Sequence, residues 1–543
     1  MAFGENKPWL KKYAPGVRVH LEYPCVPLFR FLDDAVATYP DRAAIVFADN
    51  EISYRQLGDM TDRTAAALAA LGVGKGDRVS IMLPNCPQLV AAYYGILKAG
   101  AVVVQANPMY MERELEYQLN NSGAETILML DVFYPRLQNI KRNLNLKNVI
   151  ITSLSPGGGK VEGCLQLDKL LAQSEPKSPE MQIAPQDDLA LLQYTGGITG
   201  ISKGAMLTHY NLVVNTLQTK EAVAGKCRMG QEKVLVALPL FHVYGMTTGM
   251  NLSMALAATQ IMLPRFEIDA VLQAINDHRP TLFPGAPAMF LAIVGHPRVK
   301  DYDFSSIKAC FSGSAPLSAE VADRFEALTG GRLVEGYGLT EASSVVSVNP
   351  LRGERKPGSI GQPIPDTACA VVNLDTGAKE LSPGEIGELI VRGPQLMKGY
   401  WNRPEETANT LRNGWLYTGD VAKMDEDGYI FIVGRKKDMI IASGFNVYPR
   451  DVEEVLYEHP KIAEAVVMGV SDIYRGESVK AFIVLKDGET ASEEEIIGYC
   501  RQRLAAFKVP KLIEFREQLP KTIVGKILRR VLVEEERRKL TEK

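Results

Sequence analysis

Short apolar runs alternate with helical patterns through about the first 350 residues of the chain. Residues 79–83, 101–105 and 126–130 are short, apolar and bounded by turn-forming residues, which predicts buried strands. Between such runs, helical periodicity predicts helices, for example at 54–71 and 86–100. Strands that alternate with helices are typical of parallel sheets. The same pattern predicts strands at 44–47, 52–54, 149–151, 189–194, 234–237, 281–283 and 309–312, and helices at 26–39 and 211–224.

The pattern changes near residue 360. Short alternating strands at 368–373, 387–392 and 429–433 predict a β-rich subdomain. After the charged linker at 434–438, about 105 residues remain, which is enough for a domain that folds alone. They predict strands at 439–441, 463–469 and 480–484, helices at 449–458 and 492–504, and a charged helical tail after Ile527.

These patterns predict an α/β protein with two domains. A large N-terminal domain, 1–434, combines parallel α/β subdomains with the β-rich subdomain. Residues 435–438 form a linker, and 439–543 form a small α+β domain.

Bulk composition excludes several classes of protein. A net charge of −3 without a long basic run gives no indication of nucleic-acid binding. Seven scattered cysteines without a C-x-x-C pair indicate reduced thiols and a cytoplasmic protein, not a disulfide framework or zinc site. Residues 1–12 predict no signal peptide. Polar residues interrupt the most apolar stretches, 89–105 and 245–264, so no membrane span is expected. Peripheral membrane contact and a homodimer remain open.

A glycine-rich stretch follows the strand predicted at 189–194. It reads Tyr194-Thr195-Gly196-Gly197-Ile198-Thr199-Gly200-Ile201-Ser202-Lys203-Gly204. Its glycines let backbone N–H groups approach an anion, while Thr195, Thr199 and Lys203 add hydroxyls and a positive charge. The stretch therefore predicts a polyphosphate site, with a flexible surface turn as the alternative. A Walker A loop is disfavoured, because Lys203 follows Ser202 and precedes Gly204.

A second stretch is suited to a nucleotide base. It reads Glu335-Gly336-Tyr337-Gly338-Leu339-Thr340-Glu341. The glycines beside Tyr337 leave its ring open for stacking on a purine, and the carboxylate of Glu341 suits Mg²⁺ held against phosphate oxygens. The alternative is a buried tyrosine beside a helix-capping threonine.

Three further stretches offer polar groups. Asp420 follows a Thr-Gly turn in Trp415-Leu416-Tyr417-Thr418-Gly419-Asp420 and suits both hydroxyls of a ribose, although an aspartate that only caps the turn is equally compatible. Gly434-Arg435 begins the linker. Lys526 follows Gly525 in the stretch 519–530, where a surface lysine is the simpler interpretation.

Together, these five motifs resemble those of the adenylate-forming superfamily of acyl-CoA synthetases, adenylation domains and luciferases. Over nearly the whole chain the resemblance is to bacterial long-chain fatty-acid–CoA ligases, through the further stretches 239–246 (PLFHVYGM), 311–317 (FSGSAPL) and 437–449 (KDMIIASGFNVYP). It implies two steps. A carboxylate attacks the α-phosphate of ATP to give acyl-AMP and pyrophosphate, and the thiol of coenzyme A then displaces AMP.

The resemblance also implies a role for each motif residue. Lys526, Lys203 and His242 are implied as catalytic, and Thr195 and Glu341 as ligands of Mg²⁺. The ATP and AMP site would comprise Thr195, Gly196, Gly197, Thr199, Gly200, Lys203, Ser314, Ala315, Gly336, Tyr337, Gly338, Thr340, Glu341, Asp420, Arg435 and Lys526. The acyl pocket would include His242, Gly313 and Ser314. Residues 435–438 would be a hinge with Lys437 as the hinge residue, 439–543 would be a mobile lid, and Gly444 would line the tunnel for the thiol.

Two positions of the glycine-rich stretch depart from the family pattern. Ile198 stands where the family usually has threonine, and Ser202 where many members have proline. His242 also fits a core histidine, and the small residues of 245–258 fit either room for an acyl chain or close helix packing. The alternatives in function are a medium-chain, aryl or dicarboxylate CoA ligase, an acyl-AMP ligase that uses a carrier-protein thiol, and an inactive nucleotide- or acyl-binding protein.

Overall fold

The structure is a computed structural model of the chain. It describes residues 3–48, 50–155, 157–195, 202–442, 445–472, 476–522 and 527–541. The chain forms two compact units. The large unit comprises Leu10–Ala368 and Arg392–Leu416, and the small unit comprises Met1–Trp9, Cys369–Val391 and Tyr417–Lys543.

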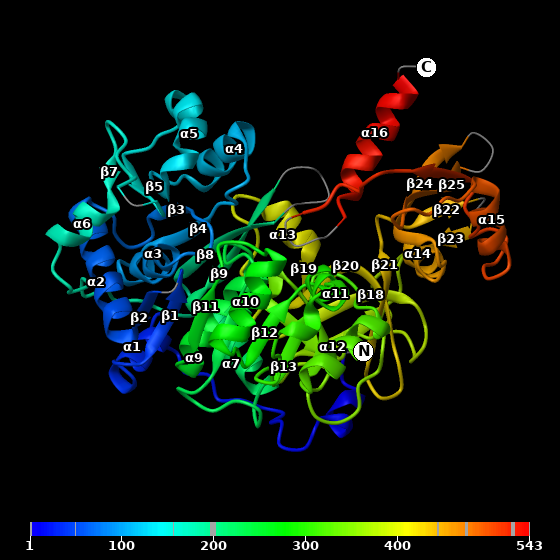
Figure 1. The fold of residues 1–543 in the computed structure, drawn as a ribbon, viewed down its shortest axis with the longest axis horizontal. Coiled ribbons are helices and arrows are strands. Elements are labelled where there is room, and N and C mark those ends of the chain that lie inside the picture. The colour runs from blue at the N-terminus through cyan, green and yellow to red at the C-terminus, as the bar shows by residue number, and fades with distance from the viewer. Residues whose placement is uncertain are drawn as a thin grey trace. The chain divides into compact units, whose positions relative to one another are not determined.

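The large unit is built on two sheets (Figure 1). One consists of β3 (Arg78–Met82), β4 (Val102–Gln105), β5 (Thr126–Leu130), β6 (Asn148–Thr152), β7 (Leu165–Gln166), β8 (Leu189–Thr195) and β9 (Lys203–Thr208). The other consists of β1 (Ala43–Phe47), β2 (Asn50–Ser53), β10 (Lys233–Val236), β11 (Thr259–Met262), β12 (Leu282–Gly285), β13 (Ala309–Ser312), β14 (Arg332–Leu339), β15 (Ser344–Val348) and β16 (Gln362–Pro363).

Both sheets are parallel in the middle and antiparallel at an edge. The seven-stranded sheet has the order β7-β6-β5-β3-β4-β8-β9, and only β8 and β9 pair antiparallel. The nine-stranded sheet has the order β16-β15-β14-β13-β12-β10-β11-β1-β2, with antiparallel pairs at both ends. The predicted α/β class is therefore confirmed.

Helices cover these sheets. They are α1 (Arg30–Thr38), α2 (Tyr54–Ala70), α3 (Pro87–Lys98), α4 (Glu112–Ser122), α5 (Tyr134–Ile140), α6 (Leu167–Gln173), α7 (His209–Ala222), α8 (Val243–Gly245), α9 (Leu252–Leu256), α10 (Ile268–His278), α11 (Pro287–Gly295), α12 (Ala319–Thr329) and α13 (Pro404–Thr410). A core centred on Phe283, Phe290 and Phe325 packs α10, α11 and α12 on the nine-stranded sheet. Helices α4 and α5 cover a face of the seven-stranded sheet in the same way.

A polar side chain caps the start of two helices: α2 begins at Tyr54, as its periodicity predicts, and α7 begins two residues earlier than predicted. Ser53 ends β2 and accepts a hydrogen bond from the backbone N–H of Gln56, so α2 starts at Tyr54. Thr208 caps α7 in the same way and moves its start to His209. Capping therefore sets both boundaries.

Gly245, after His242, serves close packing. A Cβ at Gly245 would lie 2.3 Å from the carbonyl oxygen of Pro239, so only glycine fits there. A π-helix, Met246–Asn251, follows α8 and is buried throughout. Among the described residues, no helix combines the length and apolar character needed to cross a membrane.

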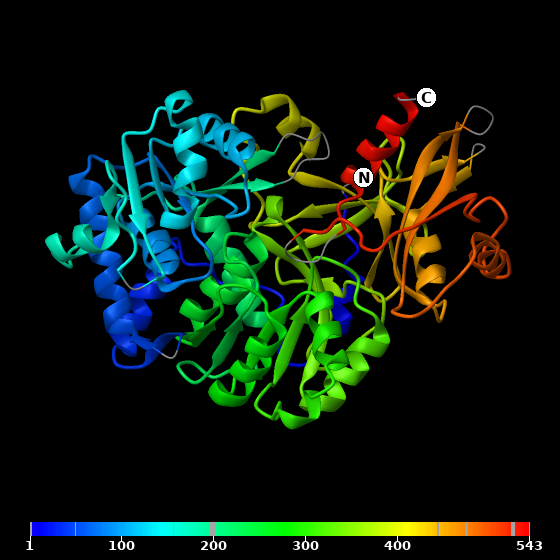
Figure 2. The ribbon, with the colours of Figure 1, turned by 45° about the horizontal axis from the view of Figure 1, so that its top comes forward.

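The small unit contains the β-rich and C-terminal segments. Its strands are β17 (Ala368–Val372), β18 (Gly387–Arg392), β20 (Trp415–Met424), β21 (Ile430–Arg435), β22 (Ile440–Ala442), β23 (Phe445–Val447), β24 (Ile462–Asp472), β25 (Gly476–Leu485) and β26 (Leu512–Phe515), and its helices are α14 (Pro449–Tyr457), α15 (Glu493–Arg501) and α16 (Arg529–Thr541). A short strand, β19 (Leu411–Arg412), pairs with the start of β20. Figure 2 shows the long antiparallel strands β24 and β25 in orange. The core around Val467, Ala481 and Ile496 holds α14 and α15 on this sheet.

Candidate functional site

The predicted phosphate loop connects two antiparallel strands. Thr195 ends β8, Lys203 begins β9, and the two residues are partners in the ladder. Strand β9 was not predicted, because its pairing with β8 is visible only in three dimensions. Gly196, Gly197, Ile198, Thr199 and Gly200 lie outside the described residues, as does Ile201. The structure therefore places the two ends of the loop and brings Thr195 beside Lys203.

Lys203 and Glu341 both contact Tyr400, a residue that the motifs did not indicate. The hydroxyl of Tyr400 donates a hydrogen bond of 2.6 Å to Oε1 of Glu341. The Nζ of Lys203 lies 5.0 Å from the centroid of the Tyr400 ring, within the range of a cation–π interaction. Burial and the charge of Glu341 both raise the pKa of Tyr400, so its phenol stays protonated at neutral pH.

The backbone of residues 397–401 holds these groups in place. Met397 N–H donates to the carbonyl oxygen of Glu341 (2.8 Å), and Trp401 N–H donates to that of Gly204 (2.8 Å). Met206 N–H donates to the carbonyl oxygen of Gly399 (2.9 Å). Segment 397–401 therefore lies along β9 and also contacts the 3₁₀ turn Thr340–Ala342, which carries Glu341.

The glycine and aromatic residues of the second motif lie on β14. Gly336, Tyr337 and Gly338 pair with β15, and the register shifts between Tyr337 and Gly338. A Cβ at Gly338 would lie 1.7 Å from the carbonyl oxygen of Ser344, so this glycine permits close contact between strands. Tyr337 is half-buried, whereas Thr340 is buried in the following turn.

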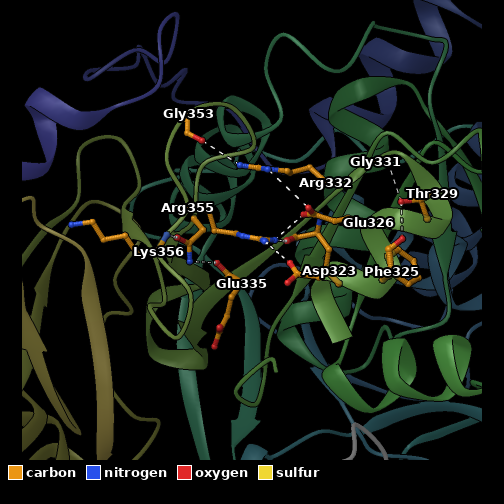
Figure 3. A network of polar contacts seen from close by, with 12 residues as sticks. Asp323, Phe325, Glu326, Thr329, Gly331, Arg332, Glu335, Gly353, Arg355 and Lys356 are labelled. Carbon is orange, nitrogen blue, oxygen red and sulfur yellow. Dashed lines mark hydrogen bonds and ion pairs between the residues drawn. The ribbon is translucent and has the colours of Figure 1, made fainter. Parts of the chain in front are cut away.

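Two arginines anchor the base of β14 (Figure 3). Arg355 donates to Oε1 of Glu326 on α12 (2.8 Å) and to the carbonyl oxygen of Leu333 (2.9 Å). Arg332 of β14 approaches Oε2 of the same glutamate at 3.9 Å. Glu326 in turn accepts the backbone N–H of Leu333 at 2.8 Å. The strand that presents Tyr337 is thus held at its first residues by a half-buried network of charges.

Replacing Arg355 with alanine should destabilise the large unit by about 1–3 kcal/mol, because a charged group that hydrogen-bonds Glu326 and a backbone carbonyl is lost. Urea denaturation should show a lower midpoint. Arg298→Ala is a suitable control, since the exposed Arg298 lies 3.8 Å from an exposed aspartate, Asp269. Equal midpoints for the two variants would contradict the anchoring role.

The residues predicted for the acyl pocket lie at the carboxyl ends of β10 and β13. His242 follows β10, and its Nδ1 accepts the backbone N–H of Tyr244 at 3.2 Å. The hydroxyl of Tyr244 donates to the carbonyl oxygens of Phe311 (2.9 Å) and Gly285 (3.2 Å). A Cβ at Gly313 would lie 3.1 Å from the Tyr244 ring, so the glycine gives this ring room.

Strain marks the turn after β13. Ser314 is exposed and has φ +74°, a left-handed conformation that is unfavourable for residues other than glycine. Ala315 follows it and is half-buried. Strained residues cluster at ligand sites, which agrees with the place of this turn at a strand end.

Asp420 and Arg435 lie together in the small unit. They are ladder partners on β20 and β21, and Nε of Arg435 lies 2.9 Å from Oδ1 of Asp420. Asp420 is buried, whereas the Arg435 side chain is 39% exposed. The preceding Gly419 has φ +70°, and its N–H donates to Glu388. The pair therefore presents one guanidinium and one carboxylate from a fixed turn.

Three predicted residues remain. One lies in the described part of the small unit, and two lie outside the described residues. Lys437 follows β21, and burial lowers its pKa. Gly444 and Lys526 lie outside the described residues. Sequence reasoning missed Tyr244 and Tyr400. No local signal distinguishes them from core aromatics, because their partners come from distant segments.

Two protein-family descriptions match the chain. "AMP-binding enzyme" matches residues 32–401, and "AMP-binding enzyme C-terminal domain" matches residues 451–526. A long-chain-fatty-acid–CoA ligase of Bacillus subtilis (strain 168) is 48% identical over 552 residues, covering 98% of this chain and 98% of the relative. A ligase of the same name from Escherichia coli O157:H7 is 40% identical, covering 99% and 100%.

Solved structures agree with these matches. The ATP-bound structure of MatB from Rhodopseudomonas palustris has a TM-score of 0.85 and 32% identity, covering 94% of this chain and 98% of MatB. A Mycobacterium tuberculosis fatty acyl CoA synthetase has a TM-score of 0.74 and 30% identity, with coverage of 94% and 98%. The similarity extends over nearly the full length of each chain.

Proposed function

Because the chain belongs to the AMP-binding enzyme family, we propose that it is a long-chain fatty-acid–CoA ligase. It converts a fatty acid and ATP into acyl-AMP and pyrophosphate, and then transfers the acyl group to coenzyme A with release of AMP. The observation that carries this proposal is the full-length identity of 48% to a long-chain ligase. The contacts of Tyr400 with Lys203 and Glu341 support it, because they hold a positive charge in place and adenylation requires positive charge beside a polyphosphate.

The first step brings a carboxylate anion toward ATP, so charge neutralisation and positioning govern its rate. Lys203 and the loop residues Gly196, Gly197, Thr199 and Gly200 bind the β- and γ-phosphates. Thr195 and Glu341 suit Mg²⁺, which prefers one or two protein oxygens together with substrate phosphates. The donors fit this cation, because a hydroxyl and a carboxylate are hard oxygen ligands. When bound, Mg²⁺ supplies compensating charge on the phosphate oxygens.

Nucleoside recognition is assigned to residues of several motifs. Asp420 and Arg435 bind the ribose, and their ion pair fixes the carboxylate for its hydroxyls. Tyr337 stacks on adenine between Gly336 and Gly338, with Thr340, Ser314 and Ala315 as further contacts. The strained backbone of Ser314 supports this assignment.

The acyl carboxylate is assigned to the carboxyl ends of β10 and β13. His242, Gly313 and Ser314 line the pocket, and Tyr244 ties the ends of β12 and β13 together through two carbonyl oxygens. His242 contacts the reacting carboxylate as the third catalytic residue beside Lys203 and Lys526.

The second step requires Lys526 to leave and a thiol to enter. We assign residues 1–434 to an ATP- and acyl-binding domain, 435–438 to the hinge, and 439–543 to a mobile lid that carries Lys526. Lys437 is the hinge residue, and Gly444 passes beside the thiol.

Pyrophosphate release in the presence of ATP and Mg²⁺ tests the function. Palmitate should give the fastest release among palmitate, octanoate, benzoate and acetate, and palmitoyl-CoA should form when coenzyme A is added. Faster release with octanoate or benzoate would favour a medium-chain or aryl ligase. Adenylation without thioester formation would favour a ligase that acts on a carrier protein. Absence of release with every acid would contradict enzymatic activity.

Ile198 is expected to weaken ATP binding, because it places an alkyl group where a threonine would offer a hydroxyl to phosphate. Ile198→Thr should therefore lower the KM for ATP by about three- to tenfold, the effect of one hydrogen bond. Ile198→Val is the matched control, since it keeps the β-branched shape without the hydroxyl. A KM for ATP that is unchanged in Ile198→Thr would count against this interpretation.

A further inference from the structure

Tyr400 joins the two charged side chains that the proposed function places on the metal and the phosphates. Its hydroxyl donates to Oε1 of Glu341 at 2.6 Å, and its ring centroid lies 5.0 Å from Nζ of Lys203. Neither the glycine-rich stretch nor the Tyr-Gly-Leu-Thr-Glu stretch contains this tyrosine. One aromatic side chain from a third segment therefore contacts both.

The position of Tyr400 is set by its own backbone. Its N–H donates to Oγ1 of Thr407 at 2.9 Å, and its neighbour Trp401 donates to the carbonyl oxygen of Gly204. The residue pairs with Ala205 across an antiparallel bridge, and its side chain is 7% exposed. Because these bonds fix the backbone, and burial and the hydrogen bond to Glu341 restrict the side chain, Tyr400 is a support and not a mobile surface group.

The hydrogen bond from Tyr400 also restricts the orientation of the Glu341 carboxylate. In this contact the phenol is the donor, because an ionised carboxylate oxygen can only accept. A carboxylate that accepts a hydrogen bond at one oxygen has a fixed rotation about its side chain. Among the described residues, Tyr400 is the partner found for Oε1.

We propose that Tyr400 is a positioning residue for the metal and phosphate site: its hydroxyl orients Glu341 toward a bound divalent cation, and its ring holds the ammonium group of Lys203 on the phosphate side. This inference rests on the proposed function. It assigns the hydroxyl to cation-dependent binding and the ring to binding of the phosphates themselves. The two parts of the side chain can therefore be separated by mutation.

The test is calorimetric titration of the full-length protein with α,β-methylene-ATP, which cannot be adenylated, in Mg²⁺ and in EDTA. Tyr400→Phe keeps the ring and loses the hydroxyl. Its affinity for the analogue should fall about tenfold in Mg²⁺, the effect of one hydrogen bond to a charged group, and should stay within about twofold in EDTA. Tyr400→Leu, which loses the ring as well, should also bind the analogue about three- to tenfold more weakly in EDTA.

Two comparisons check that the effect passes through Glu341. Tyr400→Phe introduced into Glu341→Gln should cause no further loss in Mg²⁺, since coupled residues are not additive. Tyr13→Phe is the matched control, because the Tyr13 hydroxyl also donates at 2.6 Å, to the carbonyl oxygen of Pro363 in the same unit. It should bind the analogue like the unaltered protein.

Three results would overturn the proposal: unchanged Mg²⁺-dependent affinity in Tyr400→Phe, equal losses in Mg²⁺ and EDTA for that variant, or additive losses with Glu341→Gln. The second result would indicate a merely structural tyrosine. Absence of analogue binding by the unaltered protein would instead remove the proposed function, and this inference with it.

Discussion

Replacing Lys526 with alanine is expected to slow acyl-adenylate formation by about 10²–10³-fold, the usual cost of losing one charge-stabilising contact in the transition state. The lysine is assigned to the attacking carboxylate and the α-phosphate, where negative charge accumulates. The rate of the second step, thioester formation, should stay unchanged, because the lysine must leave the site before the thiol enters. Synthetic palmitoyl-AMP and coenzyme A should therefore still give palmitoyl-CoA at close to the normal rate.

Single-turnover pyrophosphate release and thioester formation measure the two steps separately. Lys521→Ala is the matched control, because Lys521 lies five positions upstream and forms an ion pair with Glu464 at the surface. Its rates should stay within about twofold. Equal loss of both steps in Lys526→Ala would argue against a lysine that serves adenylation alone.

Asp420→Ala should raise the KM for ATP by about 10²-fold. A carboxylate that accepts two ribose hydroxyls contributes two charge-assisted hydrogen bonds of about 1.5 kcal/mol or more each. Asp420 is suited to this task because it is buried and held 2.9 Å from Nε of Arg435 on the neighbouring strand. Loss of the carboxylate removes the ribose contact and also leaves Arg435 without this partner.

The ratio of the affinities for ATP and 2′-deoxy-ATP measures the contact with the ribose. The unaltered protein should bind ATP more tightly than 2′-deoxy-ATP, and Asp420→Ala should bind the two nucleotides almost equally. Lys423→Ala alters an exposed residue on the same strand and should keep the preference. A preference for ATP that persists in Asp420→Ala would assign the ribose hydroxyls to another residue.

Local signals were sufficient for most of the architecture. Apolar runs identified β5 and β13 with their observed bounds, and the change in pattern near residue 360 marked the β-rich segment. Buried parallel strands are recognisable because both of their faces are apolar. The motifs also indicated Lys203, Glu341, Asp420 and Arg435, which the structure brings together in two pairs of contacts, one centred on Tyr400 and one between β20 and β21.

Pairing between distant segments could not be predicted in this way. Strand β9 is short and follows glycines, so only its ladder with β8 identifies it. The sequence predicts that Gly338 leaves room for a base beside Tyr337, whereas the closest neighbour of Gly338 is the backbone of Ser344. Tyr400 was missed because its role depends on two partners that lie far away in sequence.

The bridge between Ala205 and Tyr400 joins positions almost two hundred residues apart. Closing so long a loop has an entropic cost, and contacts of this kind slow folding. During synthesis, β8 and β9 can pair as a local hairpin long before segment 397–401 exists. The strand that carries Lys203 therefore gains its final neighbour late, so a nascent chain cannot form the contacts of Tyr400 with Lys203 and Glu341 until residue 401 has left the ribosome.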